Sequence, residues 1–259
     1  MRVSRLTRLV WLGICLALLC GRSARGGTIY WNMNDLATPT SNNLANLVVS
    51  ALTQGNSSTT GTSGQVPSSG YPFTLSGSSG TASGGNNLNF SAKSDMLDTG
   101  SSSYLSLTLT PSAGYSGTVT AIGFGSRSTG SGPTTLSLRS SADAYAANVA
   151  GFSTSTNSAW TYFTSTFPSP LAIASGSALT LRLYGSGGSS ANSGNWRLDD
   201  LQFDVVIVPE PAALGLGLVG LAAAGAQAAR RGRRSGKGGE GTEPCGDHTP
   251  ASRSSSCSS

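Results

Sequence analysis

The chain has 259 residues, of which 37% are hydrophobic and only 10% are charged, and its formal net charge is +5. An ordinary soluble domain carries about 25% charged residues. Residues 27–208 contain neither His nor Cys, which excludes a Ser–His–Asp triad, a Cys–His dyad and a histidine-ligated zinc site from that stretch.

The positive charge lies at the two ends of the chain. Residues 27–208 hold five cationic side chains against seven aspartates, a net charge of −2. A protein that binds nucleic acid needs a basic surface to neutralise phosphates, so no nucleic acid partner is predicted. The terminal cations instead flank apolar segments, an arrangement typical of membrane insertion.

Residues 1–26 are predicted to be an export signal peptide. Three arginines within the first eight residues precede the apolar run Leu9–Cys20, which fits a signal-peptide core and is too short to span a bilayer. Small residues follow, so cleavage is expected after Ser23 or after Gly26. A lipoprotein signal at Cys20 is the alternative, and it is disfavoured because Leu19 stands where a small residue is required.

A second apolar segment, residues 212–229, is predicted to be a transmembrane helix. Its 18 residues carry no charge, and such a helix would be about 27 Å long, close to the thickness of the bilayer core. Four arginines follow it, and the positive-inside rule then places residues 27–208 outside the cytoplasm. The alternative is a buried helix of a soluble domain. The cluster that sets the orientation is Arg230, Arg231, Arg233 and Arg234.

The exported body, residues 27–208, is predicted to be an all-β sandwich of jelly-roll type. Short alternating runs rich in Thr and aromatic residues are separated by Gly/Ser/Asn clusters. In one run Leu105, Leu107 and Leu109 share a face, as in a half-buried antiparallel strand. Residues 46–52 fit either a helix or a strand, and 54–70 and 76–87 are predicted loops. The expected strands are 28–33, 71–75, 104–110, 118–124, 134–139, 160–167, 179–184 and 196–208.

Catalysis is not predicted. The body has no P-loop or dinucleotide fingerprint, so no cofactor is expected. A glycosidase pair of carboxylates would have to come from aspartates alone. Asp199 and Asp200 are adjacent on an expected strand and should point to opposite faces, unless a bulge intervenes.

The C-terminal region resembles a PEP-CTERM sorting domain. The resemblance covers Val208, Pro209, Glu210 and Pro211, the apolar segment and the arginine cluster, and it defines a sorting segment over residues 209–234. It implies recognition by an exosortase, a membrane protease-transpeptidase that would cut near Pro209–Pro211, and an association with exopolysaccharide in a Gram-negative-type envelope. The tail 235–259 departs from the family pattern, since such proteins usually end soon after the arginines, and its polar composition predicts disorder.

The body also resembles a recurrent ectodomain of PEP-CTERM proteins, in the stretches 104–115, 124–133, 136–145 and 195–203. This resemblance implies a fold and a location without an activity. Residues 196–200 (WRLDD) are also similar to the last strand of jelly-roll carbohydrate-binding modules. That second likeness implies a structural Ca²⁺ at Asp199, with oxygens from Asn32, Asn34 or Asp35. The alternative is an ion pair of Asp199 with Arg139 or Arg197.

The sequence therefore predicts a non-catalytic exported surface or matrix protein that an exosortase sorts at the membrane. The alternative is a carbohydrate-binding module associated with exopolysaccharide. It requires an exposed aromatic platform for stacking on sugar rings, formed by Trp31, Trp160 or Tyr184. A hydrolase is disfavoured by the residues that the body lacks.

Overall fold

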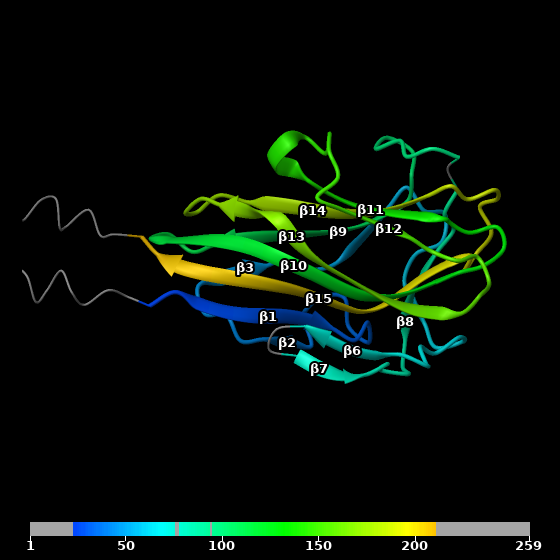
Figure 1. The fold of residues 1–259 in the computed structure, drawn as a ribbon, viewed down its shortest axis with the longest axis horizontal. Coiled ribbons are helices and arrows are strands. Elements are labelled where there is room, and N and C mark those ends of the chain that lie inside the picture. Colours follow the sequence, from blue (N-terminus) through cyan, green and yellow to red (C-terminus); the bar gives the residue numbers. More distant parts are fainter. Residues whose placement is uncertain (1–22, 76–77, 94, 211–259) are drawn as a thin grey trace, which may run out of the picture. The chain divides into compact units, whose positions relative to one another are not determined.

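The computed structural model describes residues 23–75, 78–93 and 95–210, and these form strands joined by loops and one 3-10 turn (Figure 1). The elements are β1 (Arg25–Trp31), β2 (Ser41–Asn42), β3 (Leu47–Val49), β4 (Thr53–Gly55), β5 (Thr62–Ser63), β6 (Pro72–Leu75), β7 (Ser78–Thr81), β8 (Asn87–Phe90), β9 (Tyr104–Pro111), β10 (Tyr115–Ser128), β11 (Thr135–Ser140), η1 (Ser141–Asp143), β12 (Ala150–Ser153), β13 (Trp160–Ile173), β14 (Leu179–Ser186) and β15 (Trp196–Pro209).

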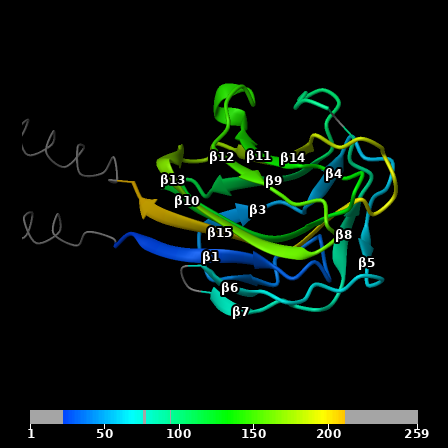
Figure 2. The same ribbon diagram turned by 45° about the vertical axis from the view of Figure 1, so that its right-hand side comes forward.

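In this described part the strands form a seven-stranded sheet, a six-stranded sheet and a separate β6–β7 hairpin. The first sheet has the order β13-β10-β15-β1-β2, with β8 pairing β15 and β5 pairing β8. The second has the order β12-β11-β14-β9-β3, with β4 also pairing β9. The two sheets pack as layers, and the hairpin lies beside the seven-stranded one (Figure 2). The predicted all-β sandwich is confirmed.

The hydrophobic core between the sheets is built from strands in which apolar and polar residues alternate. Leu105, Leu107 and Leu109 on β9 are buried, and β9 pairs in register with Leu179–Ser186 of β14. From the other sheet, Trp196 is fully buried and stacks on Phe90, with ring centroids 4.3 Å apart. The longer strands of both sheets therefore contribute one apolar face to a single core.

The long strand β15 lies inside the seven-stranded sheet. It pairs antiparallel with β1 on one side and with β10 on the other, and its first residues also pair with β8. Its inward side chains, such as Phe203 and Val205, are buried in the core. Because it has neighbours on both edges, its backbone groups are paired along most of its length.

Most of the expected strands are found, with small shifts at their ends. The ambiguous stretch 46–52 contains the strand β3, and the predicted loops 54–70 and 76–87 contain the short strands β4, β5 and β7. At the N-terminus, β1 begins at Arg25, so the predicted signal peptide 1–26 overlaps the first two residues of this strand.

Two units can be distinguished along the chain, Met1–Pro211 and Ala212–Ser259. The predicted transmembrane segment 212–229 and the tail 235–259 lie outside the described residues. Among the residues that are described, no helix has the length and apolar character needed to cross a membrane.

We expect Leu181→Ala to lower the free energy of unfolding by about 2–5 kcal/mol, because this fully buried side chain would leave a cavity between the sheets. Val48→Ala is the matched control, since Val48 is 63% exposed and should change stability by less than about 0.5 kcal/mol. Urea unfolding of both variants measures the difference. Equal losses would contradict the assignment of the core.

Candidate functional site

The predicted sorting motif lies at the end of the last strand. Val208 and Pro209 are the final residues of β15, and Pro209 is paired with Tyr115 of β10. The backbone N–H of Glu210 donates to the carbonyl of Gly114 at 2.9 Å. The folded sandwich thus continues into the motif without a spacer. Pro211 and the arginines Arg230, Arg231, Arg233 and Arg234 lie outside the described residues.

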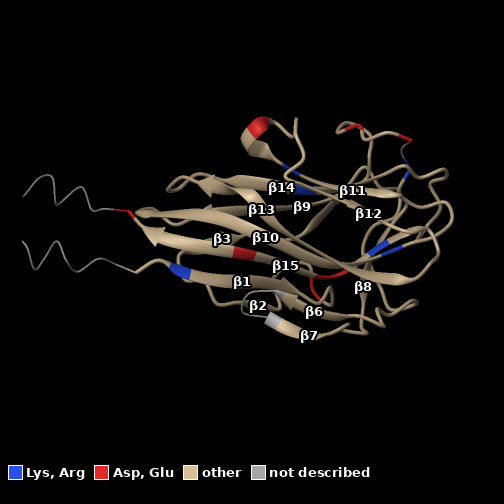
Figure 3. Cartoon of the chain, in the orientation of Figure 1, with Lys and Arg blue, Asp and Glu red and all other residues tan. Residues whose placement is uncertain are grey.

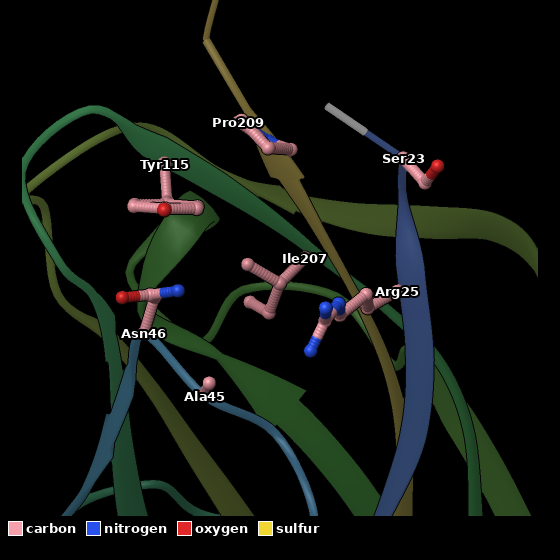
Figure 4. A pocket seen from close by; sticks show the side chains of 7 residues that line it. All are labelled: Ser23, Arg25, Ala45, Asn46, Tyr115, Ile207 and Pro209. Carbon is pink, nitrogen blue, oxygen red and sulfur yellow. The ribbon is translucent and has the colours of Figure 1, made fainter. Parts of the chain in front are cut away.

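A shallow hollow of about 320 Å³ lies beside this motif (Figure 4). Pro209, Ile207 and Tyr115 form one side of it, and Arg25 from the first strand points into it from the other. Because Arg25 pairs with Ile207 across the β1–β15 ladder, the hollow marks the end of the sandwich where β1 begins and β15 ends.

A pair of buried carboxylates lies further along β15. The strand has a bulge here, because the pairing with β10 shifts between Gly123 and Gly125, and Asp200 has a φ of 48°. The bulge is the exception under which Asp199 and Asp200 need not point to opposite faces, and it lets both carboxylates reach Ser83. Both aspartates are fully buried.

Hydrogen bonds hold this pair. Asp200 accepts from the Tyr30 hydroxyl at 2.6 Å, from the Tyr71 hydroxyl at 2.8 Å and from the N–H of Ser83 at 3.0 Å. Asp199 accepts from the Ser83 hydroxyl at 3.0 Å and from the N–H of Asp200 at 2.8 Å. Tyr71 and Ser83 flank the β6–β7 hairpin in the chain, so the pair fastens the hairpin segment to the sheet.

The electrostatics of the pair follow from burial. Burial, with the adjacent charge of Asp200, raises the pKa of Asp199 to about 7. Burial and Asp200 also raise the pKa values of Tyr30, Tyr71 and Tyr162, which therefore stay protonated and able to donate. With a pKa of about 7, Asp199 still holds its proton in about half of the molecules at neutral pH.

Aromatic rings cover the carboxylates. Tyr71 stacks on Tyr162 with centroids 5.5 Å apart, and Tyr30 stacks on Phe73 at 5.6 Å. This packing depends on a glycine of β10, because a Cβ at Gly125 would collide with the hydroxyl end of Tyr71.

The structure gives Asp199 partners other than those expected. No ion pair joins it to Arg139 or Arg197 within the described residues, since Arg139 bonds Asn148 and Tyr145 and Arg197 bonds Asn87. Asn32, Asn34 and Asp35 hydrogen-bond within their own loop or to the neighbouring residue 86. Among the described residues, no three His, Cys, Asp or Glu side chains gather as a metal site.

The hydrogen bonds that Asp199 accepts leave few lone pairs for the predicted calcium ion. One oxygen of Asp199 accepts from a backbone N–H, which cannot rotate to admit a cation, and the other accepts from Ser83. Ca²⁺ prefers six to eight oxygen ligands. The groups around Asp199 are better suited to hydrogen bonding with a protonated or ionised carboxyl. The calcium site stays an untested prediction.

The prediction of an exposed aromatic platform is wrong for two of its three residues, Trp31 and Tyr184. Trp31 is fully buried because Ile29, Trp31 and Met33 alternate into the core. Tyr184 is fully buried because Tyr104 lies directly opposite it on β9, with the rings 5.2 Å apart. Trp160 is half-buried and packs near Tyr71, with centroids 6.4 Å apart.

A different aromatic cluster lies on the outward-facing side of the six-stranded sheet. The guanidinium of Arg182 lies 4.4 Å from the ring centroid of Tyr104 and 4.2 Å from that of Tyr145. We call these three residues the Tyr–Arg cluster. Sequence reasoning missed it because Tyr145 follows a 3-10 turn, far from the strand in sequence. In β14, Thr180, Arg182 and Tyr184 alternate with buried leucines. This pattern was the one sequence signal that these three residues share the outward face.

Comparison with known proteins gives no family. No protein-family description matches the sequence, and no curated protein matches it. Among solved structures, the chain is similar to the C-terminal CBM6 of a laminarinase from Zobellia galactanivorans, with 14% identity over 69% of this chain and 98% of that one and a TM-score of 0.31. The K1 cleaved adhesin domain of Lys-gingipain from Porphyromonas gingivalis gives 9% identity, coverage of 70% and 98%, and a TM-score of 0.34.

An isomalto-dextranase from Arthrobacter globiformis, complexed with panose, gives 11% identity over 64% of this chain and 24% of that one, with a TM-score of 0.33. All three TM-scores lie below 0.5, so functional conclusions depend on this chain's own residues.

We expect the stability of the sandwich to fall as the pH rises from about 4 to about 7 because of Asp199. Its pKa is about 7 in the folded state against an ordinary value of 3.8 for an aspartate in the unfolded chain, so between these two pH values the native state holds a proton that the unfolded chain has lost. The contribution is complete below about pH 4 and lost above about pH 7, on the order of 2–4 kcal/mol. Asp199→Asn should therefore gain stability over the wild type between pH 5 and pH 8.

The measurement is urea unfolding of both proteins across that pH range. Asp98→Asn is the control. Asp98 is exposed, and hydrogen bonds from Gly100 and Ser101 lower its pKa, so it stays ionised over this pH range and its difference from the wild type should not change with pH. A constant difference between Asp199→Asn and the wild type at every pH would contradict a protonated Asp199.

We expect Gly125→Ala to displace Tyr71 and loosen the hairpin, at a cost of about 1–3 kcal/mol for forcing a methyl group into a filled site. Gly151→Ala is the matched control, since a Cβ there meets its nearest atom at 3.8 Å. Limited proteolysis should then cut Gly125→Ala within residues 68–83 faster than either the wild type or the control. Unchanged cleavage would show that the hairpin does not depend on this contact.

Proposed function

We propose that this chain is a non-catalytic exported protein of the cell surface or extracellular matrix, which an exosortase sorts through the segment 209–234. The observation that carries the proposal is the antiparallel pairing of β1 with β15, which puts the start of one strand and the end of the other at the same end of the sandwich (Figure 1). An export signal before β1 and a membrane segment after β15 both suit that arrangement, because the rest of the domain is then free to face outward.

The strand boundaries bear on both processing events. Signal cleavage after Ser23 leaves the whole of β1, whereas cleavage after Gly26 removes two residues that pair with Val206 and Ile207. We therefore favour Ser23. At the other end, Glu210 is exposed while its N–H is bonded to Gly114, so an exosortase would meet the motif directly at the edge of a folded domain.

The aspartates of the domain support a non-catalytic role. Asp199 and Asp200 are fully buried beneath tyrosine rings and Ser83, so a substrate cannot reach them without opening the hairpin. Exposed Asp35 and Asp98 accept hydrogen bonds from their own loops. Successive strands from β9 to β15 alternate between the two sheets apart from the β11–β12 pair, which supports a jelly-roll-like sandwich serving as a scaffold.

A second proposal is that the sandwich binds polysaccharide of the surrounding matrix. The Tyr–Arg cluster favours it, because half-buried aromatic rings beside a guanidinium offer both apolar ring faces and hydrogen-bond donors. It takes the place of the buried Trp31 and Tyr184 as the candidate sugar-binding surface.

We expect mass spectrometry of the protein from its native cells to show a mature N-terminus after Ser23 and a C-terminus near residues 209–211. Replacing Pro209, Glu210 and Pro211 together with Ala should leave the chain full-length at its C-terminus and in the membrane fraction. The control replaces Glu243 and Pro244 with Ala, a similar change in the tail, and should be processed normally. An unprocessed wild-type chain in the cytosol would overturn the proposal.

A further inference from the structure

Two arginines lie side by side on the outward-facing side of the six-stranded sheet. Arg139 of β11 and Arg182 of β14 are directly opposite each other in the antiparallel register. Like charges in that position repel each other. Neither guanidinium forms an ion pair with a carboxylate in the part of the chain that the structure describes, although the domain as a whole is mildly acidic and its charges are sparse (Figure 3).

The hydrogen-bond partners of both guanidiniums are neutral groups. Arg139 donates to the Asn148 side chain at 2.9 Å and to the carbonyl of Tyr145 at 2.8 Å. Arg182 donates one bond, to the Tyr184 hydroxyl at 3.3 Å, and its buried Nε has no partner. An arginine has five N–H donors in a planar fork, so most donors of Arg182 are left without a protein acceptor.

The tyrosine rings hold Arg182 in place. Tyr104 and Tyr145 lie within 4.4 Å and 4.2 Å of its guanidinium carbon, inside the range of a cation–π contact. Tyr145 reaches this position through two consecutive residues in the left-handed region, with φ of 56° at Ala144 and 63° at Tyr145. That backbone is costly for residues other than glycine, and Arg139 secures it through the Tyr145 carbonyl.

We infer that Arg139 and Arg182 form a binding site for a polysaccharide that carries carboxylates, such as a polyuronate. A carboxylate accepts two parallel bonds from a guanidinium, which the unpaired N–H groups on the two terminal nitrogens of Arg182 would donate, since Nε is buried. The charge of the carboxylate would also relieve the repulsion between the arginines. Half-buried Thr108 and Thr180 on the same side of the sheet add hydroxyl groups. This inference names the ligand class within the proposed polysaccharide-binding function.

The test is calorimetric titration of the full-length protein in detergent with tetragalacturonate at low salt. The fully methyl-esterified tetrasaccharide is the matched probe, because it keeps the sugar and removes the charge. We expect the acid to bind and the ester to bind at least tenfold more weakly. Arg182→Gln and Arg139→Gln should each weaken binding of the acid roughly ten- to a hundred-fold.

Arg127→Gln is the control for charge. This variant removes one cation from the seven-stranded sheet, where Arg127 lies directly opposite Arg197. It should bind tetragalacturonate like the wild type. Arg182→Lys keeps the charge and loses the planar fork, so it should bind more weakly than the wild type while keeping a similar melting temperature.

Several outcomes would overturn the inference. If the acid and the ester bind equally and Arg182→Gln has no effect, polysaccharide binding stands and the anionic site is refuted. If neither probe nor any neutral glycan binds, both proposals fail. Arg182-dependent binding to an oligonucleotide or to phosphatidylglycerol vesicles, without binding to tetragalacturonate, would assign the arginines to a different partner.

Discussion

The pairing of β15 with β1 and β10 is the constraint on which the rest of the structure depends. This strand contributes Phe203 and Val205 to the core on one side and the carboxylates of Asp199 and Asp200 to the other. Its two ladders define the middle of the seven-stranded sheet. The proposed sorting motif begins in the last residues of the same strand, so the proposed localisation depends on the geometry of this strand.

Most of the fold prediction came from the alternation of apolar and polar residues along the expected strands. Leu105, Leu107 and Leu109 could be assigned to the core from the sequence, because the period of two residues leaves only one choice of face. The sheet partners could not be predicted, since pairing between strands far apart in the chain depends on packing that the local pattern does not contain. Short strands such as β5 lack any apolar period and were expected as loops.

The candidate sites show where local patterns stop being informative. The alternation rule assigns Asp199 and Asp200 to opposite faces, and one residue with positive φ overturns it. Tyr184 is on the outward face, as its pattern indicates, yet Tyr104 covers it. The side-by-side position of Arg139 and Arg182 follows from the register of β11 and β14, which the sequence does not reveal.

The course of β15 also has a mechanical consequence for a tethered protein. If the chain is anchored beyond Glu210 and a polymer in the surroundings holds the sandwich, drag pulls β15 lengthwise against its neighbours. The hydrogen bonds of an antiparallel ladder lie perpendicular to the strands, so such a pull loads the bonds to β1 and β10 together in shear instead of breaking them one by one. A strand that lies between two ladders, as β15 does, would therefore resist a pull along its length.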